Sequence, residues 1–178
     1  IGIPAGILAA SHRKLNRVTQ VLIDTLQTLP SFVYLIPVVM LFRVGDFAAM
    51  LAVIAYSLAP AIRYTILGIE QVPTHLIEAA RAIGCTRTQI RWRIELPIAL
   101  PQIMLGINQT IMMALSMLVI TALVGTRDLG QEVYIALTKA DTGRGIIAGI
   151  GVACIAIVAD RLINRWAQRK RMEFGLQS

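Results

Sequence analysis

Apolar residues form long runs that short polar segments separate. Four runs are long enough to cross a bilayer, because a membrane-spanning helix needs about 20 mostly apolar residues; they are 18–42, 47–69, 98–124 and 146–163. A fifth, shorter run covers residues 1–10, and we expect it to be the end of a span that begins before the chain does. The pattern predicts an all-α, polytopic transmembrane helical bundle, truncated at its N-terminus, with a single transmembrane domain over residues 1–178.

Prolines fall inside three of these runs. Pro30 and Pro37 lie in 18–42, Pro60 lies in 47–69, and Pro101 lies in the first turn of 98–124, where proline is tolerated. In membranes, neighbouring helices can satisfy the carbonyl groups that a proline leaves without a donor. Each run is therefore predicted to be one span.

The composition and the distribution of charge support a membrane location. Hydrophobic residues make up 56% of the chain and charged residues only 15%, against roughly 25% in soluble domains. The bases lie at the ends of apolar runs and are not interleaved with aromatic residues, so membrane topology explains them better than nucleic-acid binding does. Thirteen of the 17 Lys and Arg residues would lie on one side, with Arg43, Arg127, Lys139 and Arg144 on the other. The positive-inside rule then places the polar segment 74–97 and the C-terminus in the cytoplasm.

The segment 74–97 is too polar to span a membrane, and it carries signals for two short helices. Gly84 is expected to end the first helix, because glycine adopts the left-handed C-terminal cap without strain. Thr86 and Gln89 have the spacing of a capping box that starts the second helix. Pro97 then marks the entry into the next span. The segment is predicted to be a helix, a glycine turn and a helix.

The first of these helices has an apolar stripe formed by Leu76, Ala80 and Ile83. Its small residues, including Ala79 and Ala82, would let another surface approach closely. Two interpretations fit these features equally: a docking site for a partner protein, or an amphipathic connector that lies on the lipid surface with its arginines at the headgroups.

One motif in this segment resembles a known family. The spacing Glu-Ala-Ala, three residues, Gly, nine residues, Ile, one residue, Leu-Pro matches every fixed position of the EAA loop of binding-protein-dependent ABC importer permeases. The resemblance implies a MetI-like permease core whose loop 74–97 docks an ABC ATPase subunit. The residues that would carry the coupling are Glu78, Ala79, Ala80, Gly84, Ile94, Leu96 and Pro97.

A second resemblance covers most of the chain and concerns the substrate. Stretches 27–37, 108–110, 114–117 and 129–131 resemble the ProW-type subgroup, which carries glycine betaine, proline betaine and choline. It implies a bacterial inner-membrane protein with a separate or fused extracytoplasmic substrate-binding protein. A homodimer is expected, because a pathway needs two such bundles and the chain has no internal repeat. Arg127-Asp128 departs from the subgroup, where glycines often precede Leu-Gly-Gln.

Residues for catalysis or cofactor binding are not apparent in the sequence. A nucleotide-binding loop needs glycine directly before its lysine, and none of Lys14, Lys139 and Lys170 follows a glycine. His12 and His75 lack the spacing of metal ligands. We therefore expect no enzyme activity, no cofactor and no metal, and assign ATP hydrolysis to a partner subunit.

Polar and aromatic residues inside the spans are candidates for the translocation pathway. Asn108, Gln109 and Ser116 share one span, where they either line the pathway or hydrogen-bond between helices. Asn108 and Gln109 point about 100° apart on a helical wheel, so they cannot both face one narrow target. Phe32 and Tyr34 could attract a quaternary ammonium through cation–π interaction.

Two carboxylates near the cytoplasmic ends of their spans, Asp24 and Asp160, are expected to form interfacial ion pairs, with Arg161 next to the second. The sequence as a whole indicates the permease subunit of an ATP-driven importer for quaternary-amine osmolytes. The alternative is a non-transporting membrane scaffold or channel subunit whose cytoplasmic loop binds lipid or another protein.

Overall fold

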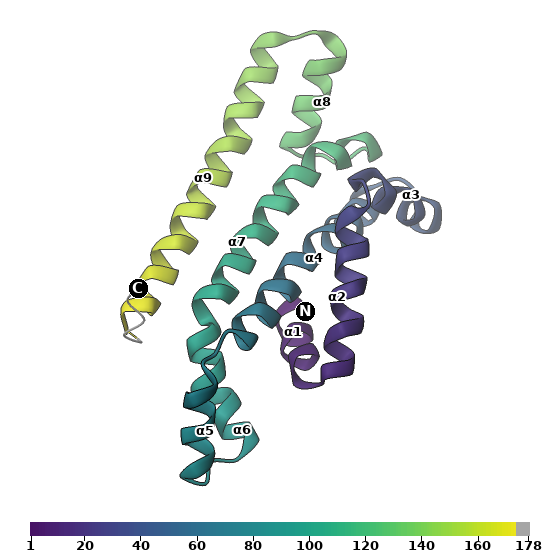
Figure 1. The fold of residues 1–178 in the computed structure, drawn as a ribbon. Helices are drawn as coiled ribbons and strands as arrows, with labels where there is room; N and C mark the ends of the chain where they lie inside the picture. The colour runs from purple at the N-terminus through teal and green to yellow at the C-terminus, as the bar shows by residue number, and fades with distance from the viewer. Residues whose placement is uncertain (174–178) are drawn as a thin grey trace.

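The computed structural model describes residues 1–173, and these form helices joined by short turns (Figure 1). The α-helices are α1 (Gly2–Ser11), α2 (Arg13–Thr28), α3 (Ser31–Phe42), α4 (Asp46–Glu70), α5 (Thr74–Ala82), α6 (Arg87–Ile90), α7 (Leu96–Thr121), α8 (Leu129–Lys139) and α9 (Thr142–Glu173). A π-helical turn, Arg91–Glu95, joins α6 to α7, and a 3₁₀ turn, Ala122–Val124, follows α7. The all-α prediction is confirmed. Residues 174–178, the end of the predicted cytoplasmic C-terminus, lie outside the described residues.

Three helical segments are long and apolar enough to cross a membrane within the described part of the chain: Asp46–Glu70, Arg87–Val124 and Thr142–Arg169. They confirm three of the predicted spans, although the last two extend beyond the predicted ends. The predicted run 18–42 is divided into α2 and α3, which together are long and apolar enough for one span but meet at an angle of 95°. The bend has a local cause: Leu29, which precedes Pro30, is extended at φ −74° and ψ 134°, as residues before proline tend to be. Pro37, by contrast, stays inside α3.

Helix α4 occupies the centre of the bundle, between α1 on one side and α7 on the other (Figure 1). Its buried positions are mostly small residues, including Ala49, Ala52 and Ala59. Small side chains let helix backbones approach closely, which is how helices pack in membranes in the absence of a hydrophobic driving force. A Cβ atom added to Gly106 of α7 would lie 2.7 Å from the Cβ of Tyr64 on α4. This glycine therefore sets the distance between the two central helices.

We expect Gly106→Ala to lower the stability of the bundle by about 1–3 kcal/mol, the usual cost of overpacking. The methyl group would meet the Tyr64 Cβ and, at 3.3 Å, the Pro60 carbonyl oxygen, neither of which can move without shifting a backbone. Thermal unfolding of the detergent-solubilised protein, followed by size-exclusion chromatography, measures the change. The matched control is Gly149→Ala, since nothing lies within 4 Å of a Cβ there. Equal melting temperatures for the two variants would contradict this packing argument.

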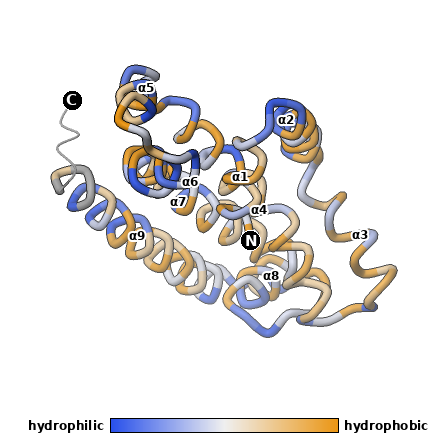
Figure 2. The backbone as a smooth tube through the Cα atoms, turned by 90° about the horizontal axis from the view of Figure 1, so that it is seen from below, coloured by the Kyte–Doolittle hydropathy of each residue, from blue (hydrophilic) through white to orange (hydrophobic). Residues whose placement is uncertain are grey.

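The outer surface of the bundle is strongly apolar along α3 and the middle of α9, as Figure 2 shows by colour. Met40 and Leu41 on α3, and Ile147 and Leu162 on α9, are more than half exposed. Such a surface would associate in water, whereas lipid tails or a second apolar surface can cover it. Polar residues instead gather at the end that carries α5 and α6.

One further element was not covered by the sequence prediction. Residues 129–139 form α8, which packs back against α7 and α9. Asp128 caps it by accepting a hydrogen bond from the backbone N–H of Gln131 at 3.1 Å. The polar residues of α8 hide its helical periodicity from a search for apolar spans.

Candidate functional site: the projecting loop and the polar cleft

The segment 74–97 projects from one end of the bundle as a helical hairpin (Figure 1). Gly84 has φ +84° and ends α5 with two hydrogen bonds: from its own N–H to the Arg81 carbonyl, and from the Cys85 N–H to the Ala80 carbonyl. This pair of bonds defines a Schellman C-cap. The predicted capping box is also present, because Thr86 and Gln89 exchange side-chain and backbone hydrogen bonds. The sequence therefore predicted both ends of the turn correctly.

The second half of the segment is not the separate short helix that was predicted. Helix α6, the π-turn Arg91–Glu95 and α7 form one continuous helical segment, Arg87–Val124. Pro97 lies directly after the π-turn, inside this continuous segment, and has no N–H to donate to the preceding turn. Helix α6 is therefore continuous with a membrane span.

The seven motif residues of the segment fall into two groups. Ala80 is 4% exposed, and Ile94, Leu96 and Pro97 are half-buried, so these four residues shape the hairpin. The remaining three, Glu78, Ala79 and Gly84, are exposed and available to a partner.

The predicted apolar stripe of α5 is wrong at Ile83. It does not share a buried face with Ala80, because it is 81% exposed at the tip of the hairpin, directly before Gly84. The sequence pattern had placed it on one face with Leu76 and Ala80. The signal that could have identified it is its place at the C-cap of α5, where the backbone leaves the helical path.

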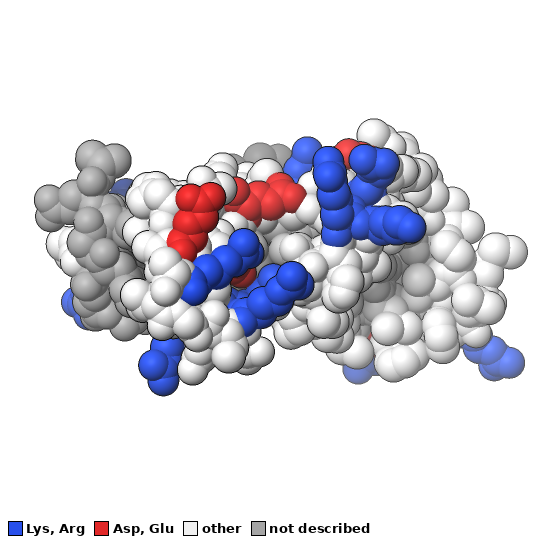
Figure 3. All heavy atoms as spheres, turned by 60° about the horizontal axis from the view of Figure 1, so that its bottom comes forward, with Lys and Arg blue, Asp and Glu red and all other residues white. Residues whose placement is uncertain are grey.

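A groove of about 520 Å³ separates this hairpin from the corner between α1 and α2. Its lining includes Arg81, Arg87 and Arg91, and Figure 3, viewed towards this end, shows Lys and Arg side chains gathered with a few acidic ones among them. Arg91 crosses the groove: its guanidinium donates to the Ser11 hydroxyl at the end of α1 and pairs with Glu95 at 3.1 Å. The hairpin is thus braced against the first helices of the bundle.

The predicted pathway residues do not converge on one site. Asn108 donates a hydrogen bond to Asp160 of α9 at 2.7 Å, whereas Gln109 lines a cleft beside α4. Their divergence follows from their adjacent positions on one helix. Asp160 also accepts a hydrogen bond from Asn164 at 2.9 Å, so amide groups and not Arg161 are its partners among the described residues. Ser116 is exposed, and its hydroxyl donates to the Met112 carbonyl one turn earlier.

The two aromatic candidates also lie apart. Tyr34 is 9% exposed; its ring packs edge-on against Tyr56 with centroids 5.5 Å apart, and its hydroxyl donates to the Leu26 carbonyl. Phe32 is 51% exposed on α3. Within a single chain, Tyr34 therefore belongs to the hydrophobic core, and only Phe32 is available to contact anything else.

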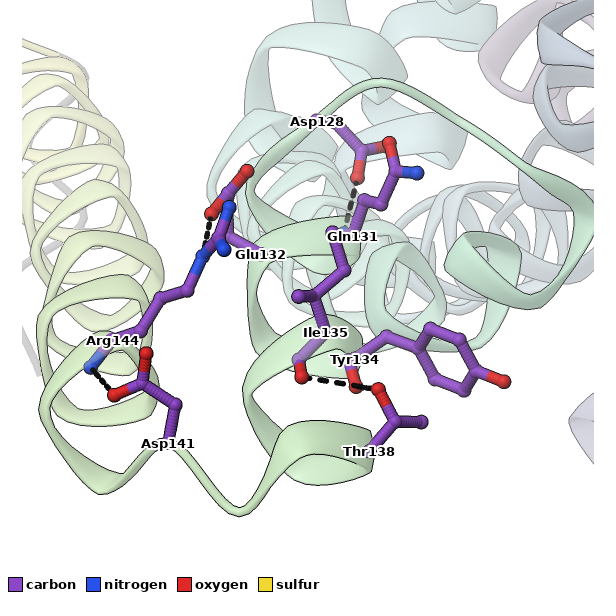
Figure 4. A network of polar contacts seen from close by, with 8 residues as sticks. All are labelled: Asp128, Gln131, Glu132, Tyr134, Ile135, Thr138, Asp141 and Arg144. Carbon is purple, nitrogen blue, oxygen red and sulfur yellow. Dashed lines mark hydrogen bonds and ion pairs between the residues drawn. The ribbon is translucent and has the colours of Figure 1, made fainter.

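The hairpin of α8 and α9 lies at the opposite end of the bundle (Figure 1), and Figure 4 shows its polar contacts. Asp141 caps α9 by accepting from the backbone N–H of Arg144 at 3.1 Å. The Arg144 guanidinium reaches back to Glu132 on α8, and this hydrogen bond stabilises the carboxylate and lowers the pKa of Glu132. Glu132 therefore stays ionised, and paired, to a lower pH than a free glutamate would.

Next to this hairpin lies a second cleft of about 520 Å³, between α4 and α7. Apolar residues of both helices form its walls, and Asp46, Arg127 and Asp128 lie among its lining residues. The Arg127-Asp128 pair, which departs from the ProW-type pattern, therefore lies beside an open cleft.

Comparison with known proteins places this arrangement in a family. The model of the binding-protein-dependent transport system inner membrane component family matches residues 2–172. The chain is 43% identical to the glycine betaine transport system permease protein OpuAB of Bacillus subtilis, over 96% of this chain and 61% of that protein. It is 44% identical to the glycine betaine/proline betaine transport system permease protein ProW of Escherichia coli, over 91% of this chain and 46% of that protein.

The similarity extends to a third bacterial permease and to a solved structure. The trimethylamine N-oxide transport system permease protein TmoV of Ruegeria pomeroyi is 41% identical over 99% of this chain and 27% of its own length. The chain thus spans between about a quarter and three fifths of these relatives. An inward-facing structure of the MetNI methionine ABC transporter matches with a TM-score of 0.83 at 21% identity, covering 96% of this chain and 86% of that chain. The helical bundle with its projecting loop belongs to the binding-protein-dependent transport system inner membrane component family.

Proposed function

We propose that this chain forms the translocation pathway of an ATP-driven ABC importer for quaternary-amine osmolytes, and that a separate ATPase drives it. The observation that carries the proposal is the hairpin of residues 74–97. It exposes Glu78, Ala79, Ile83 and Gly84 beyond the bundle, while its other half continues into a membrane span. A partner that binds this surface and displaces it would also displace the connected membrane span.

The charge distribution supports a cytoplasmic position for this hairpin. The groove beside it is lined by three arginines, and the bases of the chain concentrate at this end (Figure 3). Loops rich in Lys and Arg stay on the cytoplasmic side. The hairpin of α8 and α9 would then face the outside, where a substrate-binding protein delivers its ligand into the cleft near Asp128.

We further propose a homodimer with two ATPase subunits. Over the described residues, one chain offers clefts that open at its surface. A second copy would cover the exposed faces and enclose a pathway, as closed symmetric assemblies do. We propose osmolyte import because the names of two of the relatives state glycine betaine transport.

Uptake by the complete transporter tests this function. The transporter is expressed in a bacterial strain without osmolyte uptake systems of its own, and labelled glycine betaine, choline and carnitine are supplied. We expect ATP-dependent accumulation of at least one of them. The control carries a substitution in the nucleotide-binding lysine of the partner ATPase, which removes the energy source and leaves the permease intact. If no labelled amine accumulates above this control, the chain is better explained as a membrane scaffold.

A further inference from the structure

A polar stripe follows α2 on the side that faces α4. Asn16, Gln20, Asp24 and Gln27 recur every three or four residues, which places them on one face of the helix. Gln20 donates to the Asn16 side chain at 3.0 Å, and Asn16 in turn contacts the carboxylate of Glu70 at the end of α4. The stripe therefore runs from the end that carries α5 and α6 into the bundle, and it is anchored on α4 at its start.

Further along the stripe, two opposite charges meet inside the spanning segment. Arg63 lies about two turns before the end of α4, and its guanidinium pairs with Asp24 at 3.1 Å and donates to the side-chain amide oxygen Oε1 of Gln27 at 2.7 Å. The side chains of Arg63 and Asp24 remain 47% and 59% exposed. A charged pair at this depth faces water or a partner subunit and not hydrocarbon, because charged groups are excluded from lipid.

Cavities lie on both sides of the Arg63 side chain. One of about 90 Å³ is lined by Asp24 and Gln20, and another of about 320 Å³ by Gln27, Tyr64 and Gln109; Arg63 borders both. The larger cavity thus combines a guanidinium, two amides and an aromatic ring at one opening. A polar solute could enter the single chain here, inside a span.

We propose that Arg63 and Asp24 form a low-affinity intramembrane site for a zwitterion that carries a carboxylate and a quaternary ammonium group. The inference rests on the proposed function. It adds which residues of the pathway contact the substrate and which charges the substrate must carry. Arg63 exchanges the Asp24 carboxylate for the substrate carboxylate, which its planar guanidinium can bind through two parallel hydrogen bonds. The Asp24 carboxylate, released from Arg63, then pairs with the cationic group.

Charge balance explains why the site favours a zwitterion. When a zwitterion separates the pair, each protein charge gains a new partner and the net charge of the site does not change. A simple cation would pair with Asp24 and leave Arg63 without a counter-charge, and a simple anion would do the reverse. An uncompensated charge away from bulk water is unfavourable, so both are disfavoured relative to the zwitterion.

Direct binding to the permease tests this site in the absence of the substrate-binding protein, whose own selectivity would otherwise decide the result. The complete permease with its ATPase is placed in lipid nanodiscs with millimolar glycine betaine or choline. Saturation-transfer NMR of the trimethylammonium signal reports binding, and the two probes share this group but differ in the carboxylate. We expect a stronger signal for glycine betaine, and a loss of about tenfold in Arg63→Gln, the size expected for one hydrogen bond to a charged group.

Two further variants separate binding from folding. Arg63→Lys, which keeps the charge but not the planar fork, should retain part of the signal, and the charge exchange Asp24→Arg with Arg63→Asp should restore part of it. The matched control is Arg144→Gln, which removes an ion pair of similar exposure, 41% on each side chain, at the other end of the bundle. Size-exclusion chromatography verifies that each complex is intact.

Three results would overturn the proposal: no glycine betaine signal in the wild type, equal signals for glycine betaine and choline, or a signal that Arg63→Gln leaves unchanged. These results are distinct from a failure of the proposed function. A transporter that accumulates glycine betaine but shows none of this selectivity disproves only the intramembrane site. A transporter that accumulates no labelled amine disproves the importer itself.

Discussion

Replacing Gly84 by leucine is expected to abolish uptake while leaving membrane insertion intact. The residue adopts φ +84° in the C-cap of α5, and a left-handed conformation costs an L-amino acid roughly 1–2 kcal/mol, equivalent to about a tenfold loss in docking. No atom lies within 4 Å of a Cβ at this position, so the isolated bundle would tolerate the side chain. The leucine would instead disrupt the turn and obstruct the exposed surface formed by Glu78 and Ile83.

Uptake of labelled substrate and co-purification of the ATPase measure this effect together. Gly149→Leu is the matched control, because that glycine is also unobstructed but lies in regular helix, away from the hairpin. Glu78→Lys reverses an exposed charge on the same surface and should likewise abolish uptake. Normal uptake in both Gly84→Leu and Glu78→Lys would show that the hairpin does not couple the permease to an ATPase.

Replacing Gly130 by alanine is expected to displace α8 from α7. A Cβ at this glycine would lie 2.3 Å from the backbone oxygen of Leu118 and 2.8 Å from its carbonyl carbon. These are main-chain atoms inside a span, so a rotamer change cannot relieve the overlap. We expect a loss of about 1–3 kcal/mol, which would lower the melting temperature by several degrees.

The comparison for this prediction is Gly151→Ala on α9. A Cβ there would meet only the methyl groups of Leu129, at 3.7 and 3.9 Å, which is ordinary contact. Thermal unfolding in detergent should therefore separate the two variants clearly. A Gly130→Ala protein that melts together with Gly151→Ala would mean that α8 is free to shift without cost.

The sequence predicted the parts of the fold that depend on local patterns. Long apolar runs gave three spans, and Gly84, Thr86 and Gln89 gave the turn of the hairpin, because capping depends on residues only a few positions apart. The bend at Pro30 could not be predicted in the same way. Proline is tolerated in membrane helices, and Pro37, seven residues later, stays inside one. Whether a proline breaks or only interrupts a helix depends on neighbours that the sequence does not place.

The candidate site shows the same limit. The motif identified the hairpin, but it did not separate residues that shape it, such as Ala80, from those that are exposed, such as Ala79. Asp24 was correctly expected to form an ion pair, and its partner proved to be Arg63, 39 positions away. The polar spacing along residues 16–27 carried the signal for the cleft, but the apolar residues between them led to the prediction of a simple span.

The π-turn that joins α6 to α7 makes one long helical rod of the hairpin's second half and a membrane span. The continuous segment Arg87–Val124 has 38 residues, which corresponds to a rod of roughly 57 Å. A rod of that length that pivots by about 5° at one end moves its other end by about 5 Å, close to one helical turn. The hairpin would therefore need only a small angular stroke to open or close the far side of the bundle. The wider π-turn would set how stiffly that stroke is transmitted.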